Sequence, residues 1–269
     1  MSDPYANILD LNEDTQIKLS NSLEIRAADP HMKQIIDSYL SEIRWVDGMR
    51  ILDVGCGTGA ITRELAKHQR VTEVIGIDPS RIFVEKARSI TQNENTTYLV
   101  GDGKSLPFPD KKFDAVVFHT VLCHVPSPEL FIREAYRVLK KDGQLVIFDG
   151  DYSLRSVAIG EHDPLQACIE IMKKYNCYDI WLVRRLPSVI RSNGFENLVV
   201  RSYGYLAANP DYMINFLERG IERLVDFGQI SAETAKALKA EASQRVEDGR
   251  FFGFIPFLGF IATKKEWVS

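Results

Sequence analysis

The stretch ILDVGCGTGAIT, from Ile51 to Thr62, places three glycines within five positions directly after an apolar run. Glycine inside a regular element costs roughly 0.5–1 kcal/mol relative to alanine, so this density indicates a special backbone requirement. The apolar run predicts a strand, and the residues after the glycines predict a helix. The glycines therefore belong to a strand-to-helix turn that bends tightly or lies against a ligand.

Short apolar runs alternate with amphipathic segments from residue 50 to about residue 150. The predicted strands are 50–55, 72–78, 96–102, 113–120 and 143–149, and the predicted helices are 59–68, 80–90 and 128–141. Continuous apolar strands separated by helices indicate a parallel sheet that is covered on both faces. Right-handed crossovers then give an α/β fold with an open, doubly wound sheet.

The regions on either side of this core are less regular. Upstream, helices are expected at 15–27 and from Pro30, with Asp29 as the N-cap of the second. Downstream, the pattern predicts helices at 163–178, 184–195, 211–228 and 231–248, and strands at 196–205 and 251–264. Pro256 removes a ladder donor from the last strand, so an edge position or a bulge is expected there. The helices of 207–249 separate two strands and form an insertion.

The composition is that of an ordinary globular protein, with 269 residues, 45% hydrophobic residues and a formal net charge of −4. This charge does not favour a nucleic-acid partner. There is no apolar run long enough for a membrane span and no signal-peptide pattern, so a cytoplasmic protein is expected. Its cysteines, Cys56, Cys123, Cys168 and Cys177, form no close pair, which favours reduced thiols without a metal site.

The glycine turn is compatible with more than one ligand. Gly55, Gly57 and Ala60 satisfy the G-x-G-x-x-G/A pattern of dinucleotide-binding folds. Asp78 closes the next strand, where a carboxylate can bind ribose hydroxyl groups. These features fit any cofactor that carries adenosine, so a nicotinamide-dependent oxidoreductase is one hypothesis.

Other residues favour a different cofactor. Asp53 lies two positions before the first glycine, and a carboxylate there suits an ammonium group better than a pyrophosphate. Asp102 and Gly103 follow the third strand, where a carboxylate and a backbone N–H can bind the adenine edge. The core also begins only near residue 50, behind a helical segment, whereas many nicotinamide-binding domains begin with the first strand.

Four motifs in this order resemble the class I S-adenosylmethionine-dependent methyltransferases. They are LDVGCGTG (52–59), GIDPS (76–80), the run from Gly101 to Val125, and EAYRVLKKDGQLVIFD (134–149). The sequence is most similar to the small-molecule branch that includes the ubiquinone and menaquinone C-methyltransferases. The resemblance implies a Rossmann-like sheet of seven strands, mostly parallel, with an antiparallel last strand. It also implies S-adenosyl-L-methionine as the cofactor.

The resemblance assigns cofactor-binding roles to matching positions. Gly55 and Gly57 would border the methionine part, Asp53 would support its ammonium group, and His119 would line the same side. Asp78, followed by Pro79, would bind the ribose, while Asp102 and Gly103 would bind adenine. Arg26 has two readings, a ligand of the methionine carboxylate or a solvated charge on a helix.

Methyl transfer from a sulfonium is an in-line displacement in which the protein mainly positions the acceptor and excludes water. A general base is needed only when the nucleophile holds a proton of high pKa. The candidate catalytic residues are His124, Asp151 and Tyr152, each with a structural alternative in capping, turn formation or packing. The aromatic C-terminal run from Phe251 to Phe260 supplies core residues and some walls of an acceptor pocket.

The expected function is therefore methyl transfer to a small apolar or aromatic molecule, by one domain over residues 1–269. Its cofactor-binding core is 50–150, and the segments 1–45, 153–180 and 207–249 form a lid. The alternatives are a nicotinamide-dependent oxidoreductase and a non-catalytic S-adenosylmethionine-binding protein. The sequence leaves open the acceptor atom, whether carbon, oxygen or nitrogen, and whether the protein forms a homodimer.

Overall fold

The computed structural model describes residues 3–175, 177–207 and 210–265. Its strands are β1 (Met49–Val54), β2 (Val71–Asp78), β3 (Thr96–Val100), β4 (Phe113–His119), β5 (Leu139–Gly150), β6 (Phe195–Leu206) and β7 (Phe254–Lys264). Its α-helices are α1 (Glu13–Ala28), α2 (Pro30–Ser41), α3 (Ala60–Ala66), α4 (Arg81–Ile90), α5 (Pro128–Val138), α6 (Pro164–Lys173), α7 (Leu186–Ser192), α8 (Asp211–Asp226) and α9 (Ala232–Glu247). Short 3-10 helices are η1 (Ile8–Asp10), η2 (Leu122–His124), η3 (Tyr152–Leu154) and η4 (Leu182–Arg184).

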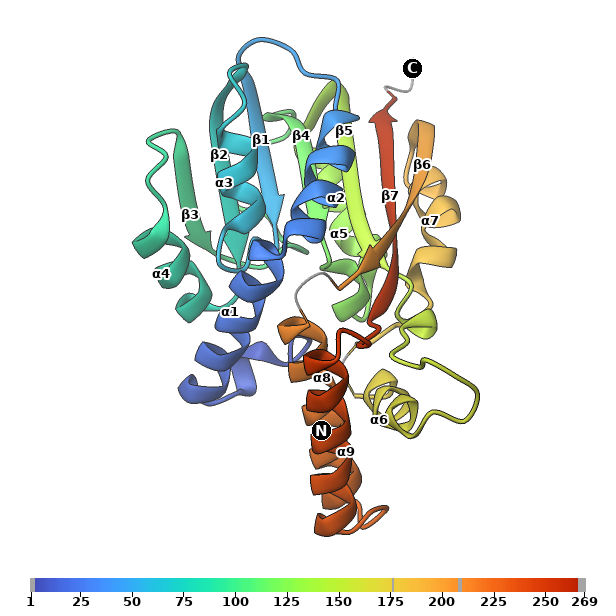
Figure 1. Cartoon of the computed structure of the whole chain (residues 1–269). Coiled ribbons are helices and arrows are strands. Elements are labelled where there is room, and N and C mark those ends of the chain that lie inside the picture. Colours follow the sequence, from blue (N-terminus) through green and yellow to red (C-terminus); the bar gives the residue numbers. More distant parts are fainter. Residues whose placement is uncertain (1–2, 176, 208–209, 266–269) are drawn as a thin grey trace.

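The strands form one seven-stranded sheet in the order β3-β2-β1-β4-β5-β7-β6. β1 pairs in parallel with β2 and β4, whereas β7 is antiparallel to both of its neighbours (Figure 1). The predicted class, a doubly wound sheet with an antiparallel last strand, is confirmed. The strand order reverses between β1 and β4, which is where open α/β sheets form a ligand crevice at their carboxyl ends.

Pro256 does not lie on an edge strand or in a bulge, so that expectation is wrong. β7 lies inside the sheet, and the irregular register of the β6–β7 pair falls at Glu196 to Val199 instead. The Pro256 carbonyl accepts a hydrogen bond from the Asp151 N–H, just beyond the last residue of β5. In an antiparallel strand the N–H and C=O of one residue point the same way. The N–H that Pro256 lacks would therefore point toward the β5 side of the strand, beyond the last residue of β5.

Helices cover both faces of the sheet, with α2 and α3 on one face and α5 and α7 on the other (Figure 1). α2 begins where the sequence predicts, because Asp29 accepts hydrogen bonds from the N–H groups of His31 and Met32. Its buried face, which includes Ile36, Tyr39 and Leu40, joins the main core. No helix in the described part of the chain is long and apolar enough to cross a membrane.

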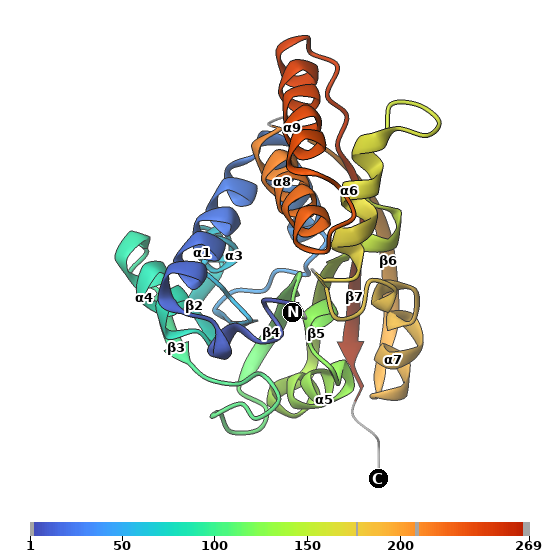
Figure 2. The same cartoon turned by 90° about the horizontal axis from the view of Figure 1, so that it is seen from below.

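A second group of helices lies beyond the carboxyl ends of the parallel strands: α1, α6, α8 and α9 (Figures 1 and 2). α8 and α9 are the predicted insertion between β6 and β7, although residues 208 and 209 of that segment lie outside the described residues. α8 packs closely against α6, and a Cβ atom at Gly220 would lie 2.2 Å from the Cys168 carbonyl oxygen. A buried ion pair, Arg245 to Asp163 at 2.6 Å, joins α9 to the N-cap of α6.

Candidate functional site

A cavity of about 510 Å³ opens at the carboxyl ends of β1, β2 and β4. This volume falls in the range of small-molecule and cofactor sites, roughly 300–1,000 Å³. Its floor is formed by the strand ends and the glycine turn, and its walls by the segment before α1, by α1 itself, by η3 and by α8. The predicted site residues that line it are Arg26, Asp53, Gly55, Gly57, Asp78, Pro79, Asp102, Gly103, His119, His124 and Tyr152.

The backbone N–H groups of the glycine turn are directed back into the protein. Gly55 and Cys56 both donate to the Ile77 carbonyl, and Gly57 donates to the Asp78 carboxylate at 2.9 Å. A dinucleotide site needs such N–H groups to face the pyrophosphate at the start of the helix. With these donors engaged and two carboxylates beside them, the turn is poorly suited to a pyrophosphate. The nicotinamide hypothesis therefore loses its main structural support.

The backbone conformation and the neighbouring side chains require glycine at positions 55 and 57, whether or not a ligand is bound. The φ angles of Gly55 and Gly57 are +71° and +54°, in the left-handed region that side chains with a Cβ disfavour. A Cβ at Gly55 would lie 2.5 Å from Val121, and one at Gly57 would lie 2.9 Å from Leu23 of α1. The absence of side chains lets the loop after β4 and helix α1 close directly over the turn.

Asp53 and Asp78 form a buried acidic floor. The Asp53 side chain accepts a hydrogen bond from the Thr62 hydroxyl at 2.6 Å, and Asp78 accepts from the N–H groups of Gly57 and Ser80. Burial outweighs these hydrogen bonds and raises the pKa of Asp53 to about 7. Burial likewise raises the pKa of Asp78 to about 6. The charged form of each carboxylate would gain from a positive or hydrogen-bond-donating ligand.

The third predicted acidic residue lies nearer to solvent. The Asp102 side chain is half exposed and accepts a hydrogen bond from the Lys104 N–H, in the turn that follows β3. The neighbouring Gly103 is buried, and a Cβ there would meet Val54 and Phe131. The carboxylates at the ends of β1, β2 and beyond β3 thus face one cavity from three adjacent strands.

His119 and Arg26 lie on the side of the cavity beside β4. The His119 ring stacks on Phe148, and its Nδ1 atom lies 2.9 Å from the Tyr39 hydroxyl. Burial, and then the positive charge of Arg26, lower the pKa of His119 well below its usual value, so the ring is neutral. Arg26 donates to the Thr120 hydroxyl at 2.8 Å, which places its guanidinium in the cavity instead of on a solvated face.

His124 is held by a carboxylate from the start of the chain. Its Nδ1 atom lies 2.7 Å from Asp3, which also accepts a hydrogen bond from the Tyr178 N–H. Burial alone would lower the pKa of His124, but the charge and hydrogen bond of Asp3 outweigh burial and raise it to about 9. His124 is therefore an imidazolium at neutral pH, and it cannot accept a proton as a general base.

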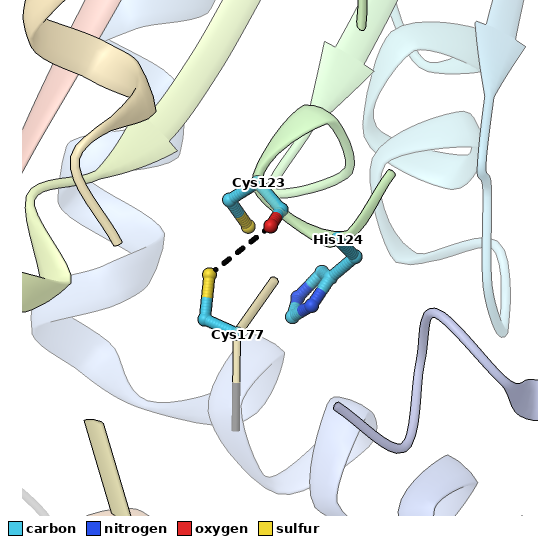
Figure 3. A group of neighbouring side chains, drawn as sticks. All are labelled: Cys123, His124 and Cys177. Carbon is cyan, nitrogen blue, oxygen red and sulfur yellow. Dashed lines mark hydrogen bonds between the residues drawn. The ribbon is translucent and has the colours of Figure 1, made fainter. Parts of the chain in front are cut away.

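Two cysteines lie beside this histidine, although the sequence separates them by 54 residues (Figure 3). The ligand atoms of Cys123, His124 and Cys177 lie within 4.8 Å of one another, close enough to share a metal ion. The Cys177 thiol instead donates to the Cys123 carbonyl, as the dashed line in Figure 3 shows. Burial raises the pKa of the Cys123 thiol well above its usual value, so this group is protonated. These contacts hold η2 against the segment that precedes η4.

Asp151 does not line the cavity, unlike the other predicted site residues. Its carboxylate pairs with Arg184 at 2.7 Å and accepts a hydrogen bond from the Ser153 hydroxyl. These contacts fix the turn after β5 and direct the Asp151 carboxylate to Arg184 and Ser153, so a catalytic role for Asp151 has no support in the structure. Tyr152, the next residue, is buried and does face the cavity.

The expectation that C-terminal aromatic residues wall the acceptor pocket is wrong. Phe257 and Phe260 are buried in the core, and no residue from Phe251 to Phe260 lines the cavity. The apolar and aromatic wall residues come instead from the segments that precede and follow the 50–150 core along the chain. They are Tyr5, Ile8, Met32, Ile36, Tyr152 and Tyr212.

Sequence reasoning also missed two wall residues, Arg155 and Arg219, which line the cavity beside Tyr212. Arg155 follows a short 3-10 helix that has no periodic signal, and Arg219 lies within the predicted helix 211–228, whose pattern indicates a helix but no ligand site. Neither arginine belongs to a sequence motif, and Arg219 lies off the buried face of its helix, so no local pattern marks either of them as a wall residue.

Comparison with known proteins agrees with this geometry. A methyltransferase domain family matches residues 52–147. The demethylmenaquinone methyltransferase of Tropheryma whipplei is 32% identical over 161 residues, which cover 54% of this chain and 66% of that protein. Alignments with two uncharacterized methyltransferases, of Schizosaccharomyces pombe and Bacillus subtilis, each span 40% of the relative's length. The chain thus spans less than two thirds of these relatives.

Solved structures share the fold. The YcgJ protein of Bacillus subtilis superposes with a TM-score of 0.59 at 20% identity, over 86% of this chain and 98% of that one. The phosphoethanolamine N-methyltransferase 2 of Haemonchus contortus, solved with S-adenosyl-L-methionine, gives a TM-score of 0.55 at 19% identity, over 87% and 53%.

Residues 52–147 match a methyltransferase domain family, and the sheet order and acidic strand ends agree with the class I S-adenosylmethionine-dependent methyltransferases. Among the classes of this domain, the chain is similar to those that modify small molecules, and one such relative is named for demethylmenaquinone.

Proposed function

We propose that this protein transfers a methyl group from S-adenosylmethionine to a small molecule bound in the same cavity. One observation carries the proposal. Three carboxylates at the ends of neighbouring strands, Asp53, Asp78 and Asp102, line one cavity around a glycine turn whose N–H groups are already engaged. This arrangement suits an uncharged adenosine joined to a group with a positive charge.

In this proposal, different residues of the chain bind different parts of the cofactor. Asp53 binds the ammonium group, Asp78 accepts from the ribose hydroxyls beside Pro79, and Asp102 with Gly103 binds the adenine edge. His119 and Arg26 face the methionine end, where a guanidinium suits a carboxylate. When bound, the cofactor supplies an activated methyl group on a sulfonium.

The ionisable groups of the cavity favour catalysis by positioning. His124 is protonated, His119 is a weak neutral base, and burial raises the pKa of Tyr152 well above its usual value. None of these three groups is poised to remove a proton of high pKa at neutral pH. We infer that the cavity orients an already nucleophilic acceptor in line with the sulfonium and excludes water.

The acceptor that we propose has an apolar or aromatic body. Tyr5, Ile8, Met32 and Tyr152 give the walls their apolar and aromatic character. The name of the Tropheryma relative, which specifies demethylmenaquinone, is consistent with such a body. Helices α6, α8 and α9, together with the segment before α1, would close over it as a lid.

Calorimetry with S-adenosylmethionine, its demethylated product S-adenosylhomocysteine and NAD tests the cofactor. We expect the first two to bind and NAD not to bind. Asp78→Ala should weaken binding by roughly 1.5–3 kcal/mol, the scale of a hydrogen bond to a charged group. Exposed Asp37 on α2 gives a matched control, since Asp37→Ala should leave the affinity unchanged.

Turnover separates an enzyme from a non-catalytic binder. Formation of S-adenosylhomocysteine, followed by mass spectrometry with a panel of small acceptors, should depend on the acceptor and on Asp78. Tight binding of NAD with no response to S-adenosylmethionine would overturn the proposal. Cofactor binding without turnover on any acceptor would favour the non-catalytic alternative.

A further inference from the structure

Arg155 is a buried cation that has no anionic partner among the residues that the structure describes. The residue is 2% exposed, and its Nε atom is buried without any hydrogen-bond partner. Its guanidinium carbon lies 3.8 Å from the centre of the Phe216 ring and 4.8 Å from that of Tyr152. Stacking on aromatic rings offsets only part of the cost of burying a charge, which normally requires pairing.

A second arginine reaches the same place from another element. Arg219 of α8 lines the cavity, and its guanidinium carbon lies 5.4 Å from the centre of the same Phe216 ring. No ion pair or hydrogen bond joins the guanidinium of either arginine to another residue of the described chain. Both guanidinium groups therefore lie near the same aromatic ring and line the same cavity, and neither is paired with a carboxylate of the described residues.

The electrostatic effect of this wall is visible at Tyr212, which interacts with Arg155, Arg219 and Arg26. Burial, the largest influence, raises the pKa of Tyr212, but Arg155, Arg26 and Arg219 together outweigh burial and lower it. The same cavity also holds the buried acids Asp53 and Asp78, at the ends of β1 and β2. The cavity is thus acidic where the strands end and basic where η3 and α8 meet.

We propose that Arg155 and Arg219 form an oxyanion-binding subsite, so that the methyl acceptor carries a carboxylate, phosphate or sulfate group on its apolar or aromatic body. Guanidinium groups bind planar and tetrahedral oxyanions through paired hydrogen bonds, which these two arginines lack in the protein alone. The inference rests on the proposed function in that it names the acceptor of the same cavity. Arg26, bonded to Thr120 beside His119, is then left for the cofactor carboxylate.

The test uses simple probes on protein saturated with S-adenosylhomocysteine. Benzoate and phenyl phosphate are titrated by calorimetry, with benzyl alcohol as the neutral analogue and inorganic phosphate as the anion without a ring. We expect both aromatic anions to bind and benzyl alcohol to bind at least about tenfold more weakly, the scale of a charge-assisted hydrogen bond. Equal binding of benzyl alcohol and benzoate would overturn the proposal.

Variants assign the effect to the two arginines. Arg155→Met and Arg219→Gln should each weaken benzoate binding by about tenfold or more, while the affinity for S-adenosylhomocysteine changes less than about twofold. Arg223 on the same helix is the matched control, because it stacks on Tyr175 and does not line the cavity. If Arg155→Met does not fold, the half-buried Arg219 still tests the subsite, since its substitution leaves Arg155 in place.

Other outcomes are equally decisive. If both variants weaken S-adenosylhomocysteine but not benzoate, the arginines hold the cofactor and the acceptor inference fails. The same titrations on protein without cofactor keep the two proposals apart. Anion binding that depends on Arg219, without any binding of S-adenosylhomocysteine, would sustain the subsite and refute the proposed function.

Discussion

Asp53 combines a fixed position with an unusual protonation state. Because burial raises its pKa to about 7, the folded protein without cofactor holds a proton that the unfolded chain releases near pH 4. The folded state then binds more protons, so stability should fall as pH rises from about 4 to 7. Asp78, with its pKa raised to about 6, contributes in the same direction.

Because Asp53 is protonated in the protein without cofactor, we predict that cofactor binding releases a proton. A cofactor ammonium beside Asp53 favours the carboxylate, so binding near pH 6 should release a proton. Calorimetry in two buffers of different ionisation enthalpy measures this release directly. Asp53→Asn should weaken binding and abolish the buffer dependence, whereas a release that persists in this variant would assign the proton elsewhere.

His124 predicts a second pH effect in a different window. Its folded pKa of about 9 lies above the ordinary value of 6.5, so its stabilising pairing with Asp3 is complete below pH 6.5. Stability should decline as pH rises from about 6.5 to 9, because the folded state loses the proton that it holds more tightly. Urea midpoints across this range measure the decline.

Asp3→Asn should flatten that decline, and it should lower the His124 pKa in an NMR titration. A pH profile that is unchanged in Asp3→Asn would remove this ion pair from the account. The pairing itself could not be foreseen, because Asp3 and His124 are 121 residues apart. Sequence motifs placed the glycines and acids of the floor, but wall contacts of this kind depend on tertiary packing.

At the level of the elements, the parallel core was predictable because each strand is a continuous apolar run between helices. The interior place of β7 was not, since a proline normally marks an edge strand. Here the end of β5 at Gly150 removes the need for the missing donor, and no local pattern encodes the length of a neighbouring strand. The walls of the cavity could not be predicted either, because they come from irregular turns and from one turn of α8, and no local pattern marks these as parts of one site.

The contact of α6 with α8 gives an element-scale prediction. Gly220→Ala would place a methyl group 2.2 Å from the Cys168 carbonyl oxygen, so the helices must separate. We expect a loss of about 1–3 kcal/mol, typical of overpacking, despite the better helix propensity of alanine. Thermal unfolding measures the loss.

Gly160→Ala is the matched control, because a Cβ there meets no atom within 4 Å. Since α8 also carries Tyr212 and Arg219, Gly220→Ala should weaken acceptor binding more than cofactor binding. Equal stability of the two variants would show that the helix pair relaxes without cost.

At the scale of the whole molecule, α6, α8 and α9 form one group beyond the strand ends. The close approach at Gly220 and the buried pair of Arg245 with Asp163 tie its three helices together. We therefore expect the lid to move as this group, and to open at a lower free energy than the sheet. Closure would order the acceptor and exclude water.

Hydrogen exchange checks the lid. Amides of 211–226 and 232–247 should exchange faster than those of 51–54, and should slow together when S-adenosylhomocysteine and an acceptor are both bound. Protection equal to that of β1 without ligand would contradict a lid and indicate a fixed scaffold. Separate slowing of α8 and α9 would contradict a single moving group.

The division between the floor and the walls of the cavity also has an evolutionary consequence. The residues that meet the cofactor in our proposal, apart from Arg26, come from 53–119, inside the segment that the methyltransferase family matches. The wall residues Tyr5, Arg155, Tyr212 and Arg219 lie outside it. Drift in the flanking segments can therefore change which metabolite is accepted while the inherited donor chemistry stays intact. Grafting the loop after β5 and helices α6, α8 and α9 onto a relative's core should transfer substrate choice as one module.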